Sequence, residues 1–176
     1  MFDKVLAGKN TIKISKDNCF EMISLMLCIF QFIFLCCANL LWSSHIIDCD
    51  MSDLYGHVRE MWRTGSIMIK GWDYSTTLEI DSSALLALPI YGVTGNIFLS
   101  FAISNIIFII LWYFVIYRLV INCGGNNTAA FLAIDMVMIP YSIGMLEYFN
   151  MLFFNGGQYT IKVLIPLVFL CISSWG

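Results

Sequence analysis

Two carboxylates stand close together where an apolar segment gives way to polar sequence. Asp48 and Asp50 are separated only by Cys49. A carboxylate in such a place can act as a general base, because it can take the proton of an attacking hydroxyl within hydrogen-bond reach. Further along, the planar guanidinium groups of Arg59 and Arg63 could bind a phosphate. The same arginines could instead pair with acids of their own helix or with lipid headgroups.

The segment that carries these side chains is predicted to be an amphipathic helix over residues 53–64. Ser52 and Asp53 form a good helix start, and Gly65 is a natural stop. Four apolar residues recur at helical spacing: Leu54, Val58, Met61 and Trp62. Such a helix should lie flat on a membrane, with the indole in the interface and the polar side chains turned toward water or a cavity. These polar side chains are His57, Arg59, Glu60 and Arg63.

A second polar and aromatic cluster follows between Gly71 and Gly92. It is predicted to be an ordered turn and then a short apolar helix, which Asp81 or Ser82 would cap and Pro89 would end. Its aromatic residues are Trp72, Tyr74 and Tyr91. They belong either to the headgroup belt of a membrane or to a platform on which a sugar ring stacks.

The composition of the whole chain is typical of a membrane protein. Hydrophobic residues make up 60% and charged residues 12% of the sequence, and the mean hydropathy is +0.82. Residues 22–42 contain no charged side chain. We therefore expect an all-α membrane protein with about four transmembrane helices and a long first external loop that carries short interfacial helices. The net charge of −3 and the absence of a basic stripe exclude nucleic acid as a partner.

Charge asymmetry orients the predicted spans. Lysines precede the first span and acids dominate the segment after it, which places the N-terminus in the cytoplasm. The predicted order is a cytoplasmic segment at 1–21, spans at 22–42, 97–117, 128–146 and 161–175, external loops at 43–96 and 147–160, and a cytoplasmic turn at 118–127. We expect one membrane domain over residues 1–176, in the plasma (inner) membrane of a bacterium. Because the fourth span stops without a polar tail, the chain is expected to be an N-terminal fragment.

Two further acids lie in or beside the predicted third span. Asp135 falls in its middle, where a charge is costly, so it either lines a substrate cavity or forms an interhelical hydrogen bond. Glu147 follows the span and could assist an external site. The seven cysteines include no CxxC pair and no zinc-like spacing with histidine. We therefore predict no metal site and no cofactor, with a divalent metal left open.

The segment from Ile47 to Gly95 resembles the N-terminal part of integral-membrane glycosyltransferases of the C superfamily, the group of the protein O-mannosyltransferases and lipid A aminoarabinose transferases. In that family an external loop opens with a catalytic acid. A tyrosine, an Arg-Glu-Met-like helix that ends in glycine, and a Pro-hydrophobic-Tyr step follow. The matching residues here are Asp48 or Asp50, Tyr55, Arg59, Glu60, Met61, Gly65, Pro89, Ile90, Tyr91 and Gly95. The family's usual Asp-Glu pair is absent, so either aspartate can correspond to the base.

The resemblance implies transfer of a sugar from a polyprenyl-phosphate donor to an acceptor on the extracytoplasmic face. Asp50 is the favoured base and Asp48 the second candidate. The candidate substrate-binding residues are Tyr55, His57, Arg59, Arg63, Asp135 and Glu147. The implied partners are the lipid-linked sugar donor, membrane lipids and an acceptor that the sequence does not identify.

The alternative is a non-enzymatic membrane scaffold or a transporter subunit. A transporter more often shows broken helices and ionisable residues inside its spans. In this sequence the acids concentrate in the predicted external loop, which favours the enzyme.

Overall fold

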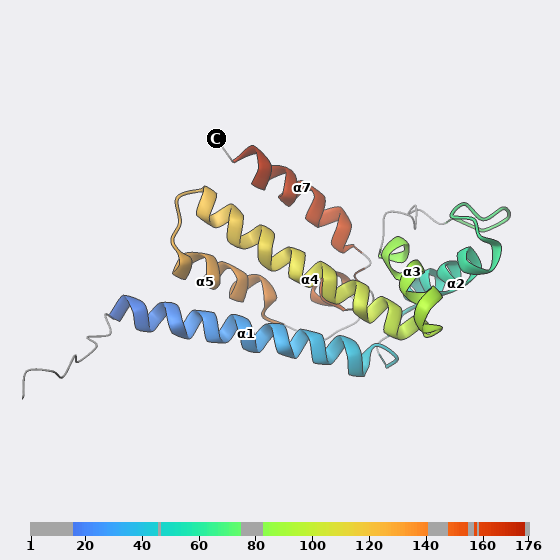
Figure 1. The fold of residues 1–176 in the computed structure, drawn as a ribbon, viewed down its shortest axis with the longest axis horizontal. Coiled ribbons are helices and arrows are strands. Elements are labelled where there is room, and N and C mark those ends of the chain that lie inside the picture. Colours follow the sequence, from blue (N-terminus) through green and yellow to red (C-terminus); the bar gives the residue numbers. More distant parts are fainter. Residues whose placement is uncertain are drawn as a thin grey trace, which may run out of the picture.

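The computed structural model describes residues 16–45, 47–74, 83–140, 148–154, 157 and 159–174. Within these residues every regular element is a helix, as the sequence predicts (Figure 1). The helices are α1 (Lys16–Trp42), α2 (Cys49–Thr64), α3 (Ala84–Thr94), α4 (Ile97–Asn122), α5 (Asn127–Met138), α6 (Tyr148–Phe153) and α7 (Thr160–Ser173). Most of the predicted cytoplasmic segment, and both predicted caps at Asp81 and Ser82, lie outside the described residues.

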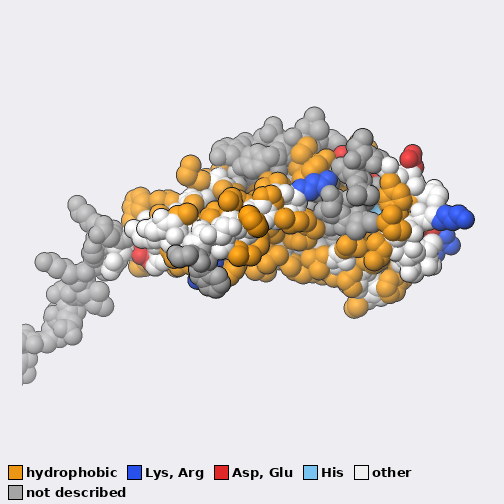
Figure 2. Space-filling view, turned by 90° about the horizontal axis from the view of Figure 1, so that it is seen from above, with side chains coloured by type: hydrophobic (Ala, Val, Ile, Leu, Met, Phe, Trp, Pro, Cys, Tyr) orange, Lys and Arg blue, Asp and Glu red, His pale blue; other side chains and the backbone are white. Residues whose placement is uncertain are grey.

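Two helices, α1 and α4, are long and apolar enough to cross a membrane. They coincide with the first and second predicted spans, but α4 continues to Asn122, so that Arg118 lies inside the helix and does not close it. In its most apolar stretch only 28% of α1 is buried inside the protein. Exposed apolar side chains such as Phe30 and Leu41 therefore line the outer side of α1. Apolar side chains also cover much of the face shown in Figure 2. An apolar surface of this extent suits lipid better than water.

The helix α5 is shorter than the predicted span at 128–146. It ends at Met138, and Ile139 has an extended backbone with φ −69° and ψ 125°. Pro140 explains this end, because a proline disfavours the helical conformation of the residue before it. Residues 141–147 lie outside the described part of the chain. The helix α7, in contrast, contains Pro166 and continues to Ser173.

The bundle is built around α4. The antiparallel helix α1 and the short helix α5 pack against it and against each other, and α7 packs along another side (Figure 1). Large buried residues of this core include Leu35, Ile109, Trp112 and Phe153. Asn122 Nδ2, at the end of α4, donates to the carbonyl oxygen of Cys171 at 3.1 Å and to Ser174 Oγ at 3.2 Å. These bonds join the C-terminal ends of α4 and α7, so the two helices run parallel.

Buried amide side chains join α6 to the bundle. Asn105 Nδ2 of α4 donates to Asn39 Oδ1 of α1 at 2.7 Å. Both amide groups also donate to the carbonyl oxygen of Phe153 at the end of α6. We call these three groups the amide network. Gly157 lies against it, because a Cβ there would come within 2.5 Å of Asn105 Oδ1.

Helices α2 and α3 form a small unit at the end of the bundle, beside the start of α4 (Figure 1). Its core includes Met51, Leu54, Val58, Met61, Ala84, Ala87, Ile97 and Phe101. Three residues of the predicted apolar stripe of α2 therefore face α3 and α4 and not lipid, whereas the position of α2 at a membrane surface stays a prediction. The neighbouring apolar helix α3 packs on these residues, so they are not available to lipid. Trp62 alone among the four stripe residues is exposed, at 56%.

The ends of α2 and α3 differ in part from the prediction. Helix α2 ends at Gly65, as predicted, in the left-handed conformation with φ 66°. It begins at Cys49 and not at Asp53, because Asp48 already caps it. Pro89 lies inside α3, so the prediction that it ends this helix was wrong. The proline removes one backbone hydrogen bond in the middle of the helix, and α3 continues until Gly95 turns the chain with φ 64°.

Candidate functional site

The two candidate bases lie in the first turn of α2, a short distance after the end of α1. The Asp48 carboxylate is half-buried, and its Oδ1 accepts a hydrogen bond from the backbone N–H of Met51 at 2.8 Å. Asp50 is exposed, and the Cys49 thiol donates to its Oδ1 at 3.6 Å. Both carboxylates occupy the positive end of the helix dipole, which stabilises negative charge.

This geometry distinguishes the two aspartates. The side chain of Asp48 holds the first turn of the helix together, because its oxygen satisfies a backbone N–H that has no partner within the helix. Asp50 does not serve as the cap, and its side chain is exposed to solvent. Of the two, Asp50 is therefore the better placed for proton transfer, and Asp48 is the better placed to position it.

Tyr55, a candidate for substrate binding, is buried between α2 and α4. Its ring packs against Phe101 at 4.6 Å and edge-on against Phe98 at 5.4 Å between ring centroids. Burial raises the pKa of its hydroxyl, and the nearby charge of Asp48 adds to the effect. The phenol therefore stays protonated at neutral pH. Its ring anchors the acidic first turn of α2 to the long apolar helix.

His57 is fully buried, so the prediction that it turns toward water or a cavity was wrong. Its ring stacks on Trp72 at 5.0 Å and meets Tyr74 edge-on at 5.5 Å. Tyr74 is held in turn by a hydrogen bond of 2.8 Å from the backbone N–H of Ile69 to its hydroxyl. The sequence places these two aromatic residues in a headgroup belt or against a sugar, whereas here they enclose a histidine. Burial lowers the pKa of His57, because the charged imidazolium loses its water.

The two arginines of α2 are both exposed, but only one is paired. Arg63 Nε donates to Glu60 Oε2 at 2.8 Å, and a second guanidinium nitrogen bonds the other carboxylate oxygen. Arg63 holds the pKa of Glu60 below its usual value through this contact. The alternative of pairing within the helix therefore applies to Arg63. Arg59 makes no ion pair with any described residue, so it is the freer of the two for an anion.

The sequence did not reveal a pocket of about 310 Å³ at the other end of α2. It is lined by Met61, Trp62, Gly65, Ser66, Ile67, Leu88 and Pro89. Trp62 lies over α3 because Gly92 has no side chain, and a Cβ there would come within 2.3 Å of the indole. A helix rises about 1.5 Å per residue, so the whole length of α2 separates this pocket from the aspartates. The structure therefore does not bring the two together.

Of the two acids predicted in or beside the third span, the structure describes only Asp135. Asp135 is 5% exposed and faces the interior of the bundle, where its backbone oxygen accepts from Gln31 Nε2 of α1 at 3.3 Å. Glu147 lies outside the described residues. Among the residues that the structure describes, no group of three His, Cys, Asp or Glu side chains could hold a metal ion.

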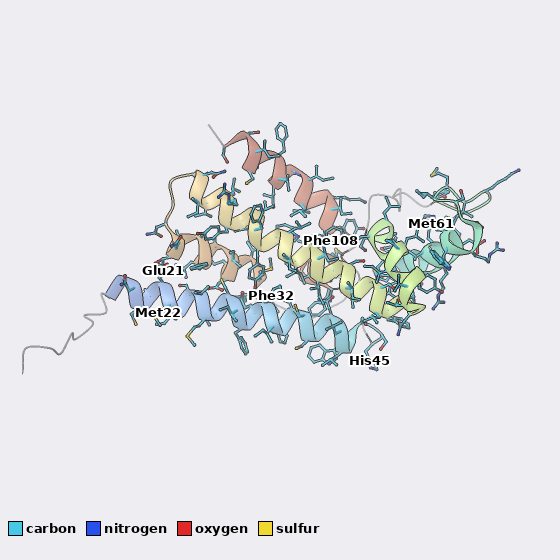
Figure 3. The ribbon with its side chains drawn as sticks, in the orientation of Figure 1. Glu21, Met22, Phe32, His45, Met61 and Phe108 are labelled. Carbon is cyan, nitrogen blue, oxygen red and sulfur yellow. The ribbon has the colours of Figure 1, made fainter. Side chains whose placement is uncertain are left out.

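The side-chain view shows where the α2–α3 unit lies relative to α1 (Figure 3). Glu21 lies near the start of α1, His45 lies just after its end, and Met61 lies beyond His45 in the α2–α3 unit. The acidic first turn of α2 thus lies between a membrane-length helix and a separate small core. No protein-family model, curated protein or solved structure matches this chain.

Proposed function

We propose that this chain belongs to an integral-membrane glycosyltransferase of the C superfamily, which moves a sugar from a polyprenyl-phosphate donor to an acceptor on the extracytoplasmic face. The observation that carries the proposal is the position of Asp48 and Asp50 in the first turn of α2, directly beyond α1. The phosphate of a lipid-linked donor lies where the hydrocarbon ends, because its tail stays in lipid. Carboxylates at this height can reach the sugar carbon next to that phosphate.

The proposal includes four membrane spans. Helices α1 and α4 are the first two, α5 with the residues after it is the third, and α7 is the fourth. The N-terminus is then cytoplasmic and the α2–α3 unit is external, in the plasma membrane of a bacterium. The parallel course of α4 and α7 supports this order, because it requires the chain between them to return across the bundle. The amide network supports it too, because it holds α6 near the α2–α3 end of α1 and α4.

In the proposed reaction Asp50 takes the proton of the acceptor hydroxyl as its oxygen attacks the anomeric carbon of the donor. The bond between that carbon and the phosphate oxygen breaks, and the polyprenyl phosphate leaves with the electron pair. Asp48 acts as a positioning residue through its cap on α2. Arg59 is the better candidate for the phosphate, because Arg63 is already bound to Glu60.

A second candidate function is a transporter subunit. The specific observation in its favour is polar structure inside the bundle: Asp135 is buried there, and the short helix α5 ends at Met138. Interrupted helices and buried ionisable groups are typical of transport sites. This function predicts movement of a substrate across vesicles and no transfer of sugar.

A transfer assay tests the main proposal. Membranes that contain the chain and its acceptor would be given a polyprenyl-phosphate-linked sugar with a radioactive label. Asp50→Asn should lower the rate by about 100-fold or more, because general-base catalysis contributes at least that much. Asp48→Asn should retain most of the activity, because asparagine is an equally good helix cap. Asp53→Asn, which changes an exposed acid of the same helix, is the matched control. Full activity in both Asp50→Asn and Asp48→Asn would remove the proposed base.

A further inference from the structure

The most unusual buried group in the bundle is the side chain of Asp135 on α5. It is 5% exposed, and neither carboxylate oxygen has a hydrogen-bond partner among the described residues. No described lysine, arginine or histidine forms an ion pair with it. A buried carboxylate that no cation pairs with is strongly destabilised in its ionised form even beside a weak donor such as the Cys28 thiol, and such a group takes up a proton instead.

The groups around Asp135 come from both neighbouring helices. From α1, Cys28 lies beside the carboxyl group and donates its thiol hydrogen to the Phe131 carbonyl at 3.3 Å. From α4, Tyr113 donates to the carbonyl oxygen of Cys28 at 3.1 Å. Cys28 and Tyr113 are the titratable groups that interact electrostatically with this carboxyl group, and neither is a cation. They therefore supply no charge that would keep Asp135 ionised.

Gln31 supplies a complementary acceptor. Its Nε2 donates to the backbone oxygen of Asp135, and its Oε1 is buried with no hydrogen-bond partner among the described residues. A protonated carboxyl group is a donor, whereas an ionised one only accepts. Protonation of Asp135 therefore adds a donor to a region that contains an unused acceptor.

We propose that Asp135 is a proton-binding site that keeps its proton at neutral pH. The site lies in the interior of the bundle, between α5 and the two membrane-length helices. It does not depend on the proposed sugar transfer, and the transfer can fail without affecting it.

A groove beside this site gives it a route for apolar molecules. The groove has a volume of about 320 Å³ and lies between α1, α4 and α5. It is lined by Leu25, Cys28, Ile29, Phe32, Ile110, Tyr113, Phe131 and Ile134. Cys28 and Tyr113 belong both to the lining and to the surroundings of Asp135. Asp135 does not line the groove itself, but an apolar reagent in the groove contacts Cys28 and Tyr113, two of the groups around the carboxyl group, whereas a charged reagent is held back by desolvation.

An apolar carbodiimide is the probe that fits this arrangement. The carboxyl proton passes to one carbodiimide nitrogen, and the carboxylate oxygen bonds to the central carbon, which gives an O-acylisourea. Transfer of the acyl group from this oxygen to the second nitrogen then gives a stable N-acylurea. The product contains all atoms of both reactants, and no oxidant or leaving group is needed. Because the first step consumes the proton, labelling reports the protonated acid.

The experiment uses the chain in phosphatidylcholine vesicles at pH 7, with dicyclohexylcarbodiimide as the probe and mass spectrometry of the α5 peptide as the readout. We expect an adduct on Asp135 that is lost in Asp135→Asn and kept in the exposed-acid control Asp53→Asn. A water-soluble carbodiimide with an added amine should modify Asp53 and leave Asp135 unmodified. The wild-type peptide decides the question even where the variant fails to fold.

Three results would overturn the proposal. The first is the absence of an adduct on Asp135 at pH 7, and the second is an adduct that forms at pH 5 but not at pH 7. The third is modification of Asp135 by the water-soluble reagent at the rate of Asp53. Sugar transfer measured on the same vesicles separates this proposal from the proposed function.

Discussion

The amide network makes an asymmetric prediction for two alanine substitutions. Asn105→Ala leaves Asn39 Oδ1 buried without the donor that now lies 2.7 Å away. Such an orphaned group costs about 1–3 kcal/mol, and the lost bonds themselves add about 1 kcal/mol. The Phe153 carbonyl stays satisfied, because Asn39 Nδ2 still donates to it at 2.9 Å. We therefore expect Asn105→Ala to lower the free energy of unfolding by about 3 kcal/mol.

The reverse substitution should cost less. In Asn39→Ala one N–H of Asn105 Nδ2 loses its acceptor, but the other still donates to the Phe153 carbonyl, so no atom is left wholly without a partner and the loss is about 1 kcal/mol. The double variant should be more stable than the sum of the two losses predicts, by about 1–2 kcal/mol, because it removes the orphaned oxygen as well.

The assay is denaturant unfolding in detergent micelles, with Asn18→Ala at an exposed position of α1 as the matched control. Equal losses in the two single variants, or strict additivity in the double variant, would refute this reasoning. Either result would mean that the amide network does not hold α6 against α1 and α4.

Two further predictions concern the α2–α3 unit. Gly92→Ala places a methyl group within 2.3 Å of the indole that covers it, so we expect a shift in tryptophan emission and a loss of about 1 kcal/mol. Val93→Ala, which changes an 88% exposed neighbour, should change neither quantity, and an unshifted emission in Gly92→Ala would contradict the packing. His57 has a folded-state pKa below its unfolded value of about 6.5, so the unfolded state binds more protons and stability should fall as the pH drops below about 6.5. His57→Gln should remove this loss and His45→Gln, at the exposed histidine, should keep it; a pH dependence that survives His57→Gln would show that another group causes it.

Length and hydropathy were sufficient to predict α1 and α4, because a long uncharged stretch has few alternatives to a helix. The end of α2 at Gly65 could also be predicted, since glycine readily adopts the positive φ that the turn requires. The start of α2 was missed because Ser52 and Asp53 have the same capping chemistry as Asp48. Only the three-dimensional structure shows that the first of these residues forms the cap.

The effects of two prolines on their helices were predicted wrongly, one as too weak and the other as too strong. Pro140 was passed over within a span that hydropathy alone extended to residue 146, although it restricts the residue before it and ends α5. Pro89 was taken as a helix end, but packing of α3 on α2 and α4 compensates for the single lost bond. The effect of a proline depends on how much tertiary packing lies beyond it, which the local sequence does not report.

In the candidate site, too, some features could be predicted from the sequence and others could not. The acidic first turn could be located from the sequence, because carboxylates follow an apolar span. The burial of His57 could not, because its partners Trp72 and Tyr74 lie on a separate segment and also suit a membrane interface or a sugar. The amide network joins residues as far apart as Asn39 and Phe153, and single polar residues within apolar runs give no sign of their partners.

The most direct test of the central claim uses the cysteine between the two aspartates. Cys49 is exposed, and so is Cys123, which the proposed topology places on the cytoplasmic side. A membrane-impermeant maleimide applied to the outer face should alkylate Cys49, and the polyprenyl-phosphate-linked sugar should slow this reaction. Cys123 should react only after permeabilisation, at a rate that the donor does not change. If the donor leaves the alkylation rate of Cys49 unchanged, the sugar does not bind at the first turn of α2, and the proposed site is wrong.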